Sequence, residues 1–257
     1  MTSPASVAVE VSVPSVLRAN LERVRERIAQ ACRRAGRAPD EVRLLAVTKG
    51  ASAHWTRELA RLGQLDLGEN RVAGLEAKAA QLAQLRPAPR WHFIGHLQRN
   101  KARRVVSTAT AVHSVDTTRL LDALEAHCRD AERTLDVYLE AKLVERDPRS
   151  GFAPEELARA VECCAQLPHL RLRGLMTMAA PDAGSAVGDV ESQSCARATF
   201  AQLRELAARL PAQAFADDRV ELSMGMSADL EAAIHEGAHC VRVGSALFEG
   251  LDGAESA

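Results

Sequence analysis

The sequence predicts a single (β/α)8 TIM barrel, an α/β fold, on three observations. Short β-branched or aliphatic runs alternate with longer segments of helical spacing, which is typical of a parallel sheet. Eight such runs are present, and eight strands close a barrel. The length of 257 residues suits one barrel. An open, doubly wound sheet is the alternative, but no G-x-G-x-x-G motif follows the first run and the chain has no Walker loop.

The predicted elements follow one another along the chain. The strands, in order, are RLLAVT, LDLG, WHFIG, AVHSV, LDVYLEAKL, LRLRGLM, RVELSM and HCVRVG. Apolar residues at helical spacing predict helices over Val16–Ala35, Glu69–Leu85, Thr117–Arg133, Pro154–Gln166, Ser192–Leu210 and Ala228–Glu236. We expect residues 1–14 to be a flexible tail and residues 15–257 a single domain. Small residues over 181–189 predict a loop after the sixth strand, at the end where barrels place active sites.

The composition argues against several classes of partner. The net charge is −1 and only 3% of residues are aromatic, which disfavours nucleic acid and anionic membranes. No stretch reads as a signal peptide or reaches the apolar length of a membrane span. The six cysteines form no C-x-x-C pair, so we expect free thiols in a reducing cytoplasm.

Lys49 ends the first predicted strand. Because alternate residues of a strand share a face, it lies on the face of Leu45 and Val47. Ligands bind at this end of barrel strands, so Lys49 can lie partly desolvated there, which favours the neutral amine that attacks an aldehyde. The alternative is a surface lysine that opens a loop, and this residue alone favours that alternative.

Small residues follow the seventh and eighth predicted strands, in LSMGMSAD and VRVGSALF, and each run opens a helix. Barrels often bind phosphate between these two loops, where helix N-termini present free N–H groups. Ser227 and Ser245 would add hydroxyl donors, while Gly225 and Gly244 would let a ligand approach the backbone. Ser227 as a helix cap is the alternative, and the two roles are compatible.

Arg242 is predicted to point into the barrel. Val241 and Val243 share the apolar face that meets the helices, so Arg242 faces the interior. A buried arginine needs an acceptor. A ring nitrogen of a ligand and the carboxylate of Glu140 are equally compatible with the sequence.

The interior face of the fifth predicted strand is polar, because Tyr138, Glu140 and Lys142 alternate along it. Lys142 is therefore a second candidate amine near the mouth. We favour instead an internal ion pair, either Glu140–Lys142 or Glu140–Arg242.

The segment HEGAH at 235–239 matches the H-E-x-x-H zinc motif. That site needs both histidines on one face of one helix. Gly237 predicts the end of a helix and His239 opens the eighth strand, so we expect the histidines on different elements and no zinc.

Six segments together carry a family resemblance. They are LLAVTK around Lys49, GEN at 68–70, WHFIGHLQRNK at 91–101, RLRGLMTM at 171–178, LSMGMSADLEAAI at 222–234 and VRVGSALFEG at 241–250. They resemble the pyridoxal phosphate homeostasis protein family, which shares its barrel with the N-terminal domain of alanine racemase. The pair WHFIG-x-LQ-x-NK and SMGMS-x-D is highly specific, and the resemblance covers nearly all of the chain beyond the tail.

The resemblance implies pyridoxal 5′-phosphate (PLP) as the cofactor. Lys49 is implied as the lysine that forms an imine with it, and Arg242 as the residue that faces the pyridine nitrogen. The other implied cofactor-binding residues are Asn70, Met226, Ser227, Gly244 and Ser245. Because a guanidinium keeps its proton, Arg242 cannot readily protonate the ring nitrogen, and the ring is then a poor electron sink.

The sequence departs from the family pattern at four positions. Arg71 follows GEN where Tyr is common, and His96 replaces the Pro of WHFIGP. Lys142 and Arg149 replace an Asn and a Lys in and after the fifth strand. The mouth is therefore more basic than the family pattern.

The expected function is that of a cytoplasmic, monomeric PLP carrier that is not an enzyme and supports PLP homeostasis. Supply of PLP to apo-enzymes is implied by the resemblance alone. A small PLP-dependent racemase is the runner-up, and a phosphate-binding barrel without PLP is a third reading. A two-base racemase needs a second acid/base group. The sequence continues only to Ala257 after the eighth strand, and its one tyrosine is Tyr138.

Overall fold

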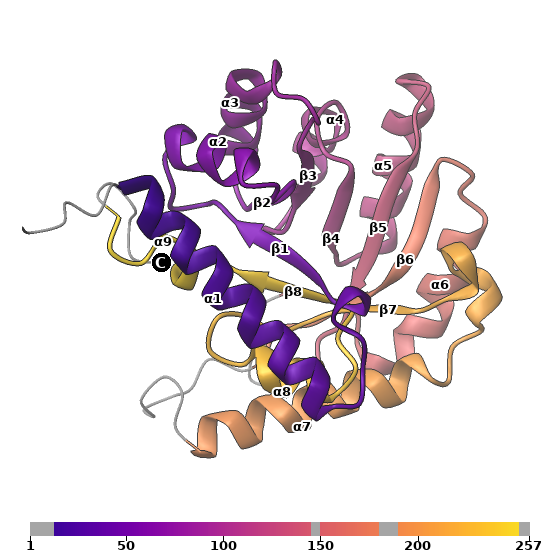
Figure 1. Cartoon of the computed structure of the whole chain (residues 1–257). Helices are drawn as coiled ribbons and strands as arrows, with labels where there is room; N and C mark the ends of the chain where they lie inside the picture. Colours follow the sequence, from indigo (N-terminus) through magenta and orange to yellow (C-terminus); the bar gives the residue numbers. More distant parts are fainter. Residues whose placement is uncertain (1–12, 145–149, 180–189, 252–257) are drawn as a thin grey trace, which may run out of the picture.

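The computed structural model describes residues 13–144, 150–179 and 190–251. Eight parallel strands close into a barrel in sequence order, with β8 beside β1. Figure 1 shows the helices arranged around the outside of the strands. The predicted fold class is confirmed.

All eight predicted strands are present. They are β1 Arg43–Val47, β2 Asp66–Glu69, β3 Arg90–Phe93, β4 Ala111–Val115, β5 Leu135–Glu140, β6 Leu170–Met176, β7 Glu221–Ser223 and β8 Cys240–Val243. The described helices are α1 Val13–Arg34, α2 Ala53–Arg61, α3 Val72–Leu82, α4 Ala102–Val106, α5 Thr118–Asp130, α6 Leu157–Ala165, α7 Val190–Ala207, α8 Leu230–His235 and α9 Ser245–Phe248.

Some helix boundaries differ from the prediction. The helix expected from Glu69 begins at Val72, because Glu69 is the last residue of β2. Helices α2, α4 and α9 were not predicted. The last two span five and four residues, too few for a helical period to be recognised.

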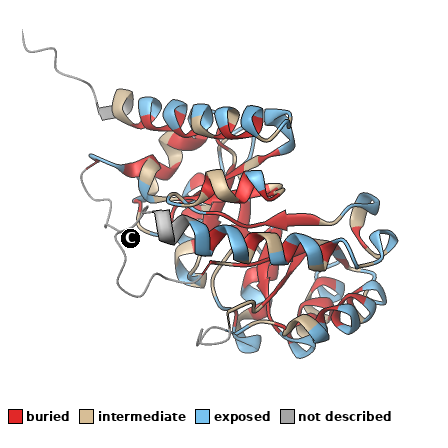
Figure 2. Ribbon diagram, turned by 90° about the horizontal axis from the view of Figure 1, so that it is seen from below, coloured by how far each residue is buried: buried red, intermediate tan, exposed pale blue. Residues whose placement is uncertain are grey.

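The main core lies between the strands and the helices. In α1, the spacing of Leu17, Leu21, Val24 and Ile28 places one apolar stripe against the barrel, and all four are buried. Figure 2 shows the same division in other helices, buried on the side that faces the strands and exposed on the other. Helix α1 packs against α8 and α9, so it braces the elements that follow the last two strands.

Several sequence expectations fall outside the described residues. They concern residues 1–12 of the expected tail, Arg149, and the loop 181–189. Helix α1 begins at Val13, within the range expected for the tail. No helix among the described residues is both long and apolar enough to cross a membrane. All six cysteines are free.

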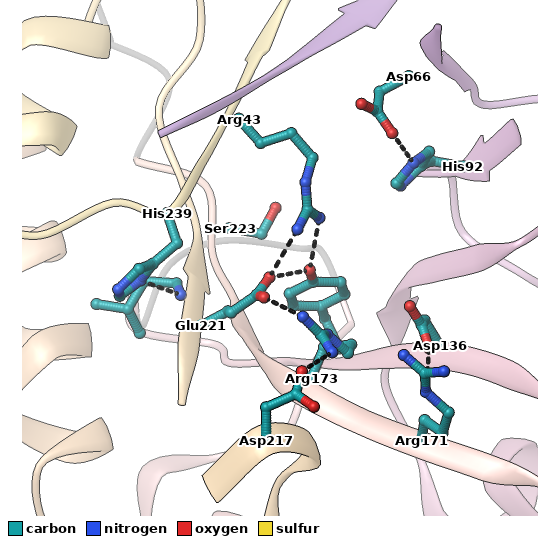
Figure 3. A network of polar contacts seen from close by, with 12 residues as sticks. Arg43, Asp66, His92, Asp136, Arg171, Arg173, Asp217, Glu221, Ser223 and His239 are labelled. Carbon is teal, nitrogen blue, oxygen red and sulfur yellow. Dashed lines mark hydrogen bonds and ion pairs between the residues drawn. The ribbon is translucent and has the colours of Figure 1, made fainter. Parts of the chain in front are cut away.

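Paired charges fill the N-terminal end of the barrel (Figure 3). Glu221, the first residue of β7, accepts hydrogen bonds from Tyr138, at 2.6 Å, and from Arg173. Arg43 lies 3.6 Å from the same carboxylate, and Arg173 also bonds Asp217 at 2.6 Å. Burial would raise the pKa of Glu221, but the Tyr138 bond and the two arginines outweigh it and lower this pKa.

Candidate functional site

A cavity of about 730 Å³ opens at the C-terminal end of the strands. It is lined by all seven residues that the sequence assigned to a cofactor: Lys49, Asn70, Met226, Ser227, Arg242, Gly244 and Ser245. They come from the ends of four strands or the loops that follow them. This is the end at which barrel enzymes bind their ligands, and the volume suits a small cofactor.

Lys49 stands two residues beyond the end of β1. Behind it, the Thr48 hydroxyl donates to Glu69 Oε1 at 2.7 Å, and the buried Lys78 ammonium donates to Glu69 Oε1 at 2.6 Å and to the Thr48 carbonyl at 2.5 Å. These bonds fix the backbone that carries Lys49. The lysine itself is exposed, which agrees with a surface lysine rather than with a partly desolvated amine, and it lines the open rim of the cavity.

Arg242 lies inside the barrel on β8, as its alternation with Val241 and Val243 predicted, and is only 5% exposed. Its guanidinium donates to the Ser223 carbonyl at 2.6 Å, to Ser223 Oγ at 2.9 Å and to the Thr177 carbonyl at 2.9 Å. Three acceptors on β7 and after β6 therefore hold the group in one orientation at the cavity wall. A fixed cationic donor at this place suits an acceptor atom of a ligand.

The loops after β7 and β8 bring small polar groups to one side of the cavity. At Gly244, an added Cβ would lie 3.3 Å from the Val47 carbonyl, so only a small residue lets the ends of β8 and β1 approach this closely. Ser245 follows as the first residue of α9 and is exposed. Arg27 of α1 donates to the Ser227 carbonyl at 2.9 Å and steadies the other loop.

Ser227 is not a helix cap. Helix α8 begins at Leu230 rather than at Ala228, and Asp229 precedes it as the N-cap residue. Asp229 Oδ1 accepts the Met226 N–H at 2.5 Å, which turns the chain before the helix starts. The Ser227 side chain is therefore not used by the helix start and lines the cavity instead.

The sequence did not single out Ile94 and Met178, which also line the cavity. Strand parity alone would have placed Ile94 on the interior face, since it lies two residues from the interior position of His92. Of the predicted rim residues, Met226 is 41% exposed, and its side chain lies at the open edge of the cavity.

Three of the four positions that depart from the family pattern lie within the described residues. His96 Nδ1 is 3.1 Å from Asp116 Oδ2 and 3.2 Å from Ser150 Oγ, and His96 lines the cavity. Arg71 is exposed just before α3. Lys142 is half-buried and lines a small adjoining space rather than the main cavity, which argues against it as a second cofactor amine.

The H-E-x-x-H segment does not form a metal site. Gly237 has φ +91° and ends α8, so His235 closes the helix while His239 precedes β8. His239 Nδ1 accepts the Leu222 N–H at 3.0 Å. Burial, with the charges of Arg219 and Arg37, lowers the pKa of His239 to about 4. In the part of the chain that the structure describes, no group of three histidine, cysteine or acidic side chains could hold a metal ion.

Comparison with known proteins identifies the family. The family description "Alanine racemase, N-terminal domain" matches residues 19–252. A pyridoxal phosphate homeostasis protein of Pseudomonas aeruginosa is 40% identical over 238 residues, which are 93% of this chain and 97% of the relative. The chain belongs to the pyridoxal phosphate homeostasis protein family. The resemblance stated from the sequence is therefore confirmed.

Solved structures agree with this assignment. PipY of Synechococcus elongatus with PLP bound matches with a TM-score of 0.76 and 35% identity, covering 90% of this chain and 99% of that chain. A Clostridium difficile alanine racemase matches with a TM-score of 0.63 and 15% identity, covering 93% of this chain and 58% of that chain. The racemase likeness shows a common barrel and nothing further.

Proposed function

We propose that this chain binds PLP reversibly at the mouth of the barrel and sequesters this reactive aldehyde. The observation that carries the proposal is that the exposed Lys49 amine and the buried Arg242 guanidinium line one cavity. An amine at the rim suits an aldehyde carbon, with which it condenses to an imine with loss of water. The small polar residues Ser227, Gly244 and Ser245 suit the phosphate, which accepts hydrogen bonds from hydroxyl and backbone N–H groups.

Arg242 favours a carrier over a catalyst. Bound PLP promotes reactions by drawing electrons into its ring, most strongly when the ring nitrogen is protonated. The Arg242 side chain, held by Ser223 and Thr177, would donate a hydrogen bond to that nitrogen and keep its own proton. We therefore infer that the family's homeostasis role, rather than turnover of amino acids, is the function of this site.

The runner-up, a small racemase, finds little support in the position of Tyr138. This phenol is 1% exposed and donates to Glu221 at the N-terminal end of the barrel, away from the cavity. It therefore offers no second acid/base group at the mouth, which a two-base racemase requires.

The proposal extends to the setting of the protein. We propose that residues 15–257 act as one PLP-binding domain preceded by a tail, that the protein is a cytoplasmic monomer, and that it supplies PLP to apo-enzymes. The exposed rim, with Met226 41% exposed, supports transfer because another protein can reach the bound cofactor there. Incubation of the PLP-loaded protein with an apo-aminotransferase, with free PLP trapped by a competing amine, would measure direct transfer.

The deciding experiment is an absorption spectrum after incubation with PLP, followed by borohydride and peptide mapping. The wild-type protein should absorb visible light, lose this band on reduction and carry the label on Lys49. Lys49→Arg keeps the positive charge and should show neither the visible band nor a PLP label. Lys101→Arg is a matched change outside the cavity and should behave as the wild-type protein does. A wild-type protein that stays colourless, or label on another lysine, would reject the proposal.

A further inference from the structure

We propose that a buried hydrogen-bond relay, Arg242–Ser223–His113–His92–Asp66, fixes the orientation of Arg242 toward the bound cofactor from inside the barrel. Ser223, His113 and His92 are then positioning residues for a cofactor that they do not touch. This inference rests on the proposed function, because it concerns how Arg242 meets the PLP ring.

The relay crosses the barrel interior. Arg242 donates to Ser223 Oγ at 2.9 Å, and Ser223 Oγ lies 2.8 Å from His113 Nδ1. His113 Nε2 is 3.0 Å from His92 Nδ1, and His92 Nε2 is 3.0 Å from Asp66 Oδ1, the pair drawn in Figure 3. All five residues are buried, none more than 6% exposed, so water does not compete for these bonds.

The rings are held in place by packing as well as by hydrogen bonds. The His113 ring stacks on Tyr138 with centroids 4.2 Å apart and an interplanar angle of 17°. Tyr138 is itself fixed by its bond to Glu221. The Ser223–His113 link joins β7 and β4, which are not neighbouring strands, so the barrel must close before the relay can form.

The protonation of the groups in the relay, beginning with Asp66, determines which atom donates and which accepts at each link. Burial would raise the pKa of Asp66, but hydrogen bonds from Arg90 and His92 outweigh it and hold this pKa well below its usual value, so the carboxylate only accepts. In the direction that we propose, His92 carries one proton, donates from Nε2 to Asp66 and accepts at Nδ1. It follows that His113 donates from Nε2 and accepts at Nδ1.

The same assignment of donors and acceptors extends through Ser223 to Arg242. Burial is the main reason that the pKa of His113 lies well below its usual value, and the charges of Arg242 and Arg43 act in the same direction, so its ring is neutral. The Ser223 hydroxyl must donate to His113 Nδ1, which leaves the Ser223 oxygen to accept from Arg242. Each donation strengthens the next acceptor, so the Ser223 oxygen binds the guanidinium more firmly than an isolated hydroxyl would.

The opposite direction needs one more proton. If His92 were cationic, it would donate from both nitrogens, and His113 would then donate from Nδ1 to Ser223. Ser223 would receive bonds from both His113 and Arg242, and its own proton would need another acceptor. The two arrangements therefore differ in the tautomer of His113, which can be measured.

Imidazole nitrogen NMR on the cofactor-free, ¹⁵N-labelled protein tests the relay directly. We expect both His92 and His113 as neutral Nε2–H tautomers, assigned by the loss of the His92 signals in His92→Gln. Ser223→Ala should shift His113 Nδ1 toward the value of a nitrogen without a hydrogen bond. A protonated Nδ1 on His113 in the wild-type protein would overturn the proposal.

PLP titrations followed by absorbance test its effect on the cofactor. Ser223→Ala should weaken PLP binding roughly ten-fold, the value of about one hydrogen bond to a charged group, and move the absorption band. Thr56→Val removes another fully buried hydroxyl, which bonds the Ser52 carbonyl outside the relay, and should change affinity less than about two-fold. Equal affinities and spectra for wild type and Ser223→Ala would reject the role of the relay.

A second pair of variants acts at a distance from the cavity. His92→Phe breaks the relay two links from Arg242, whereas His92→Gln offers an amide that can accept from His113 and donate to Asp66. His92→Phe should weaken PLP binding, whereas His92→Gln should keep most of the wild-type affinity. Equal PLP affinities for the two variants would contradict the relay. If wild type fails to bind PLP, the proposed function fails, and the histidine tautomers still decide whether the relay exists.

Discussion

At the N-terminal end of the barrel, Arg43 and Arg173 both meet Glu221, and Arg173 also meets Asp217. At the C-terminal end, Lys49 is exposed and makes no ion pair with any described residue. The charged side chains at the N-terminal end thus pair with one another, whereas Lys49 at the C-terminal end lies at the cavity without such a pair among the described residues. Burying unpaired charge is costly, so the closed end supports stability, whereas the open end leaves its amine for a ligand.

The contrast extends to the arginines of the two ends. Arg43 and Arg173 bind carboxylates, while the described bonds of Arg242 run to two carbonyls and one hydroxyl. These neutral acceptors orient the guanidinium at the wall of the cavity. A substitution at the N-terminal end should therefore alter the stability of the fold, and a substitution at the C-terminal end should alter PLP binding.

The largest effect is expected from Lys49→Ala, which tests the open end. Borohydride should fix no PLP to this variant, because the amine is gone, while weak non-covalent binding through the phosphate persists. The free energy of unfolding should change by less than about 0.5 kcal/mol, since the side chain is exposed. Peptide mapping and urea unfolding measure the two results. Label on Lys142 would show that this half-buried lysine reaches the cavity after all.

Glu221→Ala tests the closed end. It leaves Arg43 and Arg173 without their shared carboxylate and should lower the free energy of unfolding by about 3–5 kcal/mol. Lys49 labelling per folded molecule should be unchanged. Glu249→Ala is the control, because its pair with Arg23 is exposed and should contribute about 0–1 kcal/mol. Loss of labelling in folded Glu221→Ala would show that the two ends are not independent.

A pH titration of stability sharpens the comparison. The pKa of His239 falls from 6.5 to about 4 in the folded state, so between these values the unfolded chain holds more protons. Stability is then full above pH 6.5 and is lost as pH falls toward 4, by roughly 1–2 kcal/mol after discounting for partial exposure. Thermal unfolding of His239→Gln should show a flatter profile over this range. His235→Gln, at an exposed histidine, should keep the wild-type slope.

The smallest effect is expected at the rim. Met226→Ala removes a side chain that is already 41% exposed, so unfolding should change by less than about 0.5 kcal/mol. PLP affinity, measured by absorbance, should fall by about two- to three-fold, because part of the apolar cover of the cavity is lost. If Met226→Ala lowers the free energy of unfolding by more than it lowers the free energy of PLP binding, Met226 is a structural residue rather than a binding residue.

Period-two alternation made much of this architecture predictable. Val241 and Val243 placed Arg242 in the interior from sequence alone, and the eight apolar runs gave the closed barrel. Local patterns could not give the relay, because His113 and Ser223 are 110 residues apart and meet only when the sheet closes. Strand parity also left two readings of Lys49 open, because it predicts the face on which a side chain lies but not how far the amine is covered; the structure shows the lysine exposed.

The burial of Lys78 has a consequence for chemical selectivity. The sequence has four lysines, Lys49, Lys78, Lys101 and Lys142, among 33 basic residues, and the rest are arginines. Guanidinium groups do not form imines readily, since they stay protonated. Lys78 is buried beneath the rim, Lys101 and Lys142 are half-buried, and Lys49 is the one exposed lysine of the four. Few other lysine amines on the surface therefore compete with Lys49 for an aldehyde. This limits imine formation elsewhere on the protein and favours reaction at Lys49.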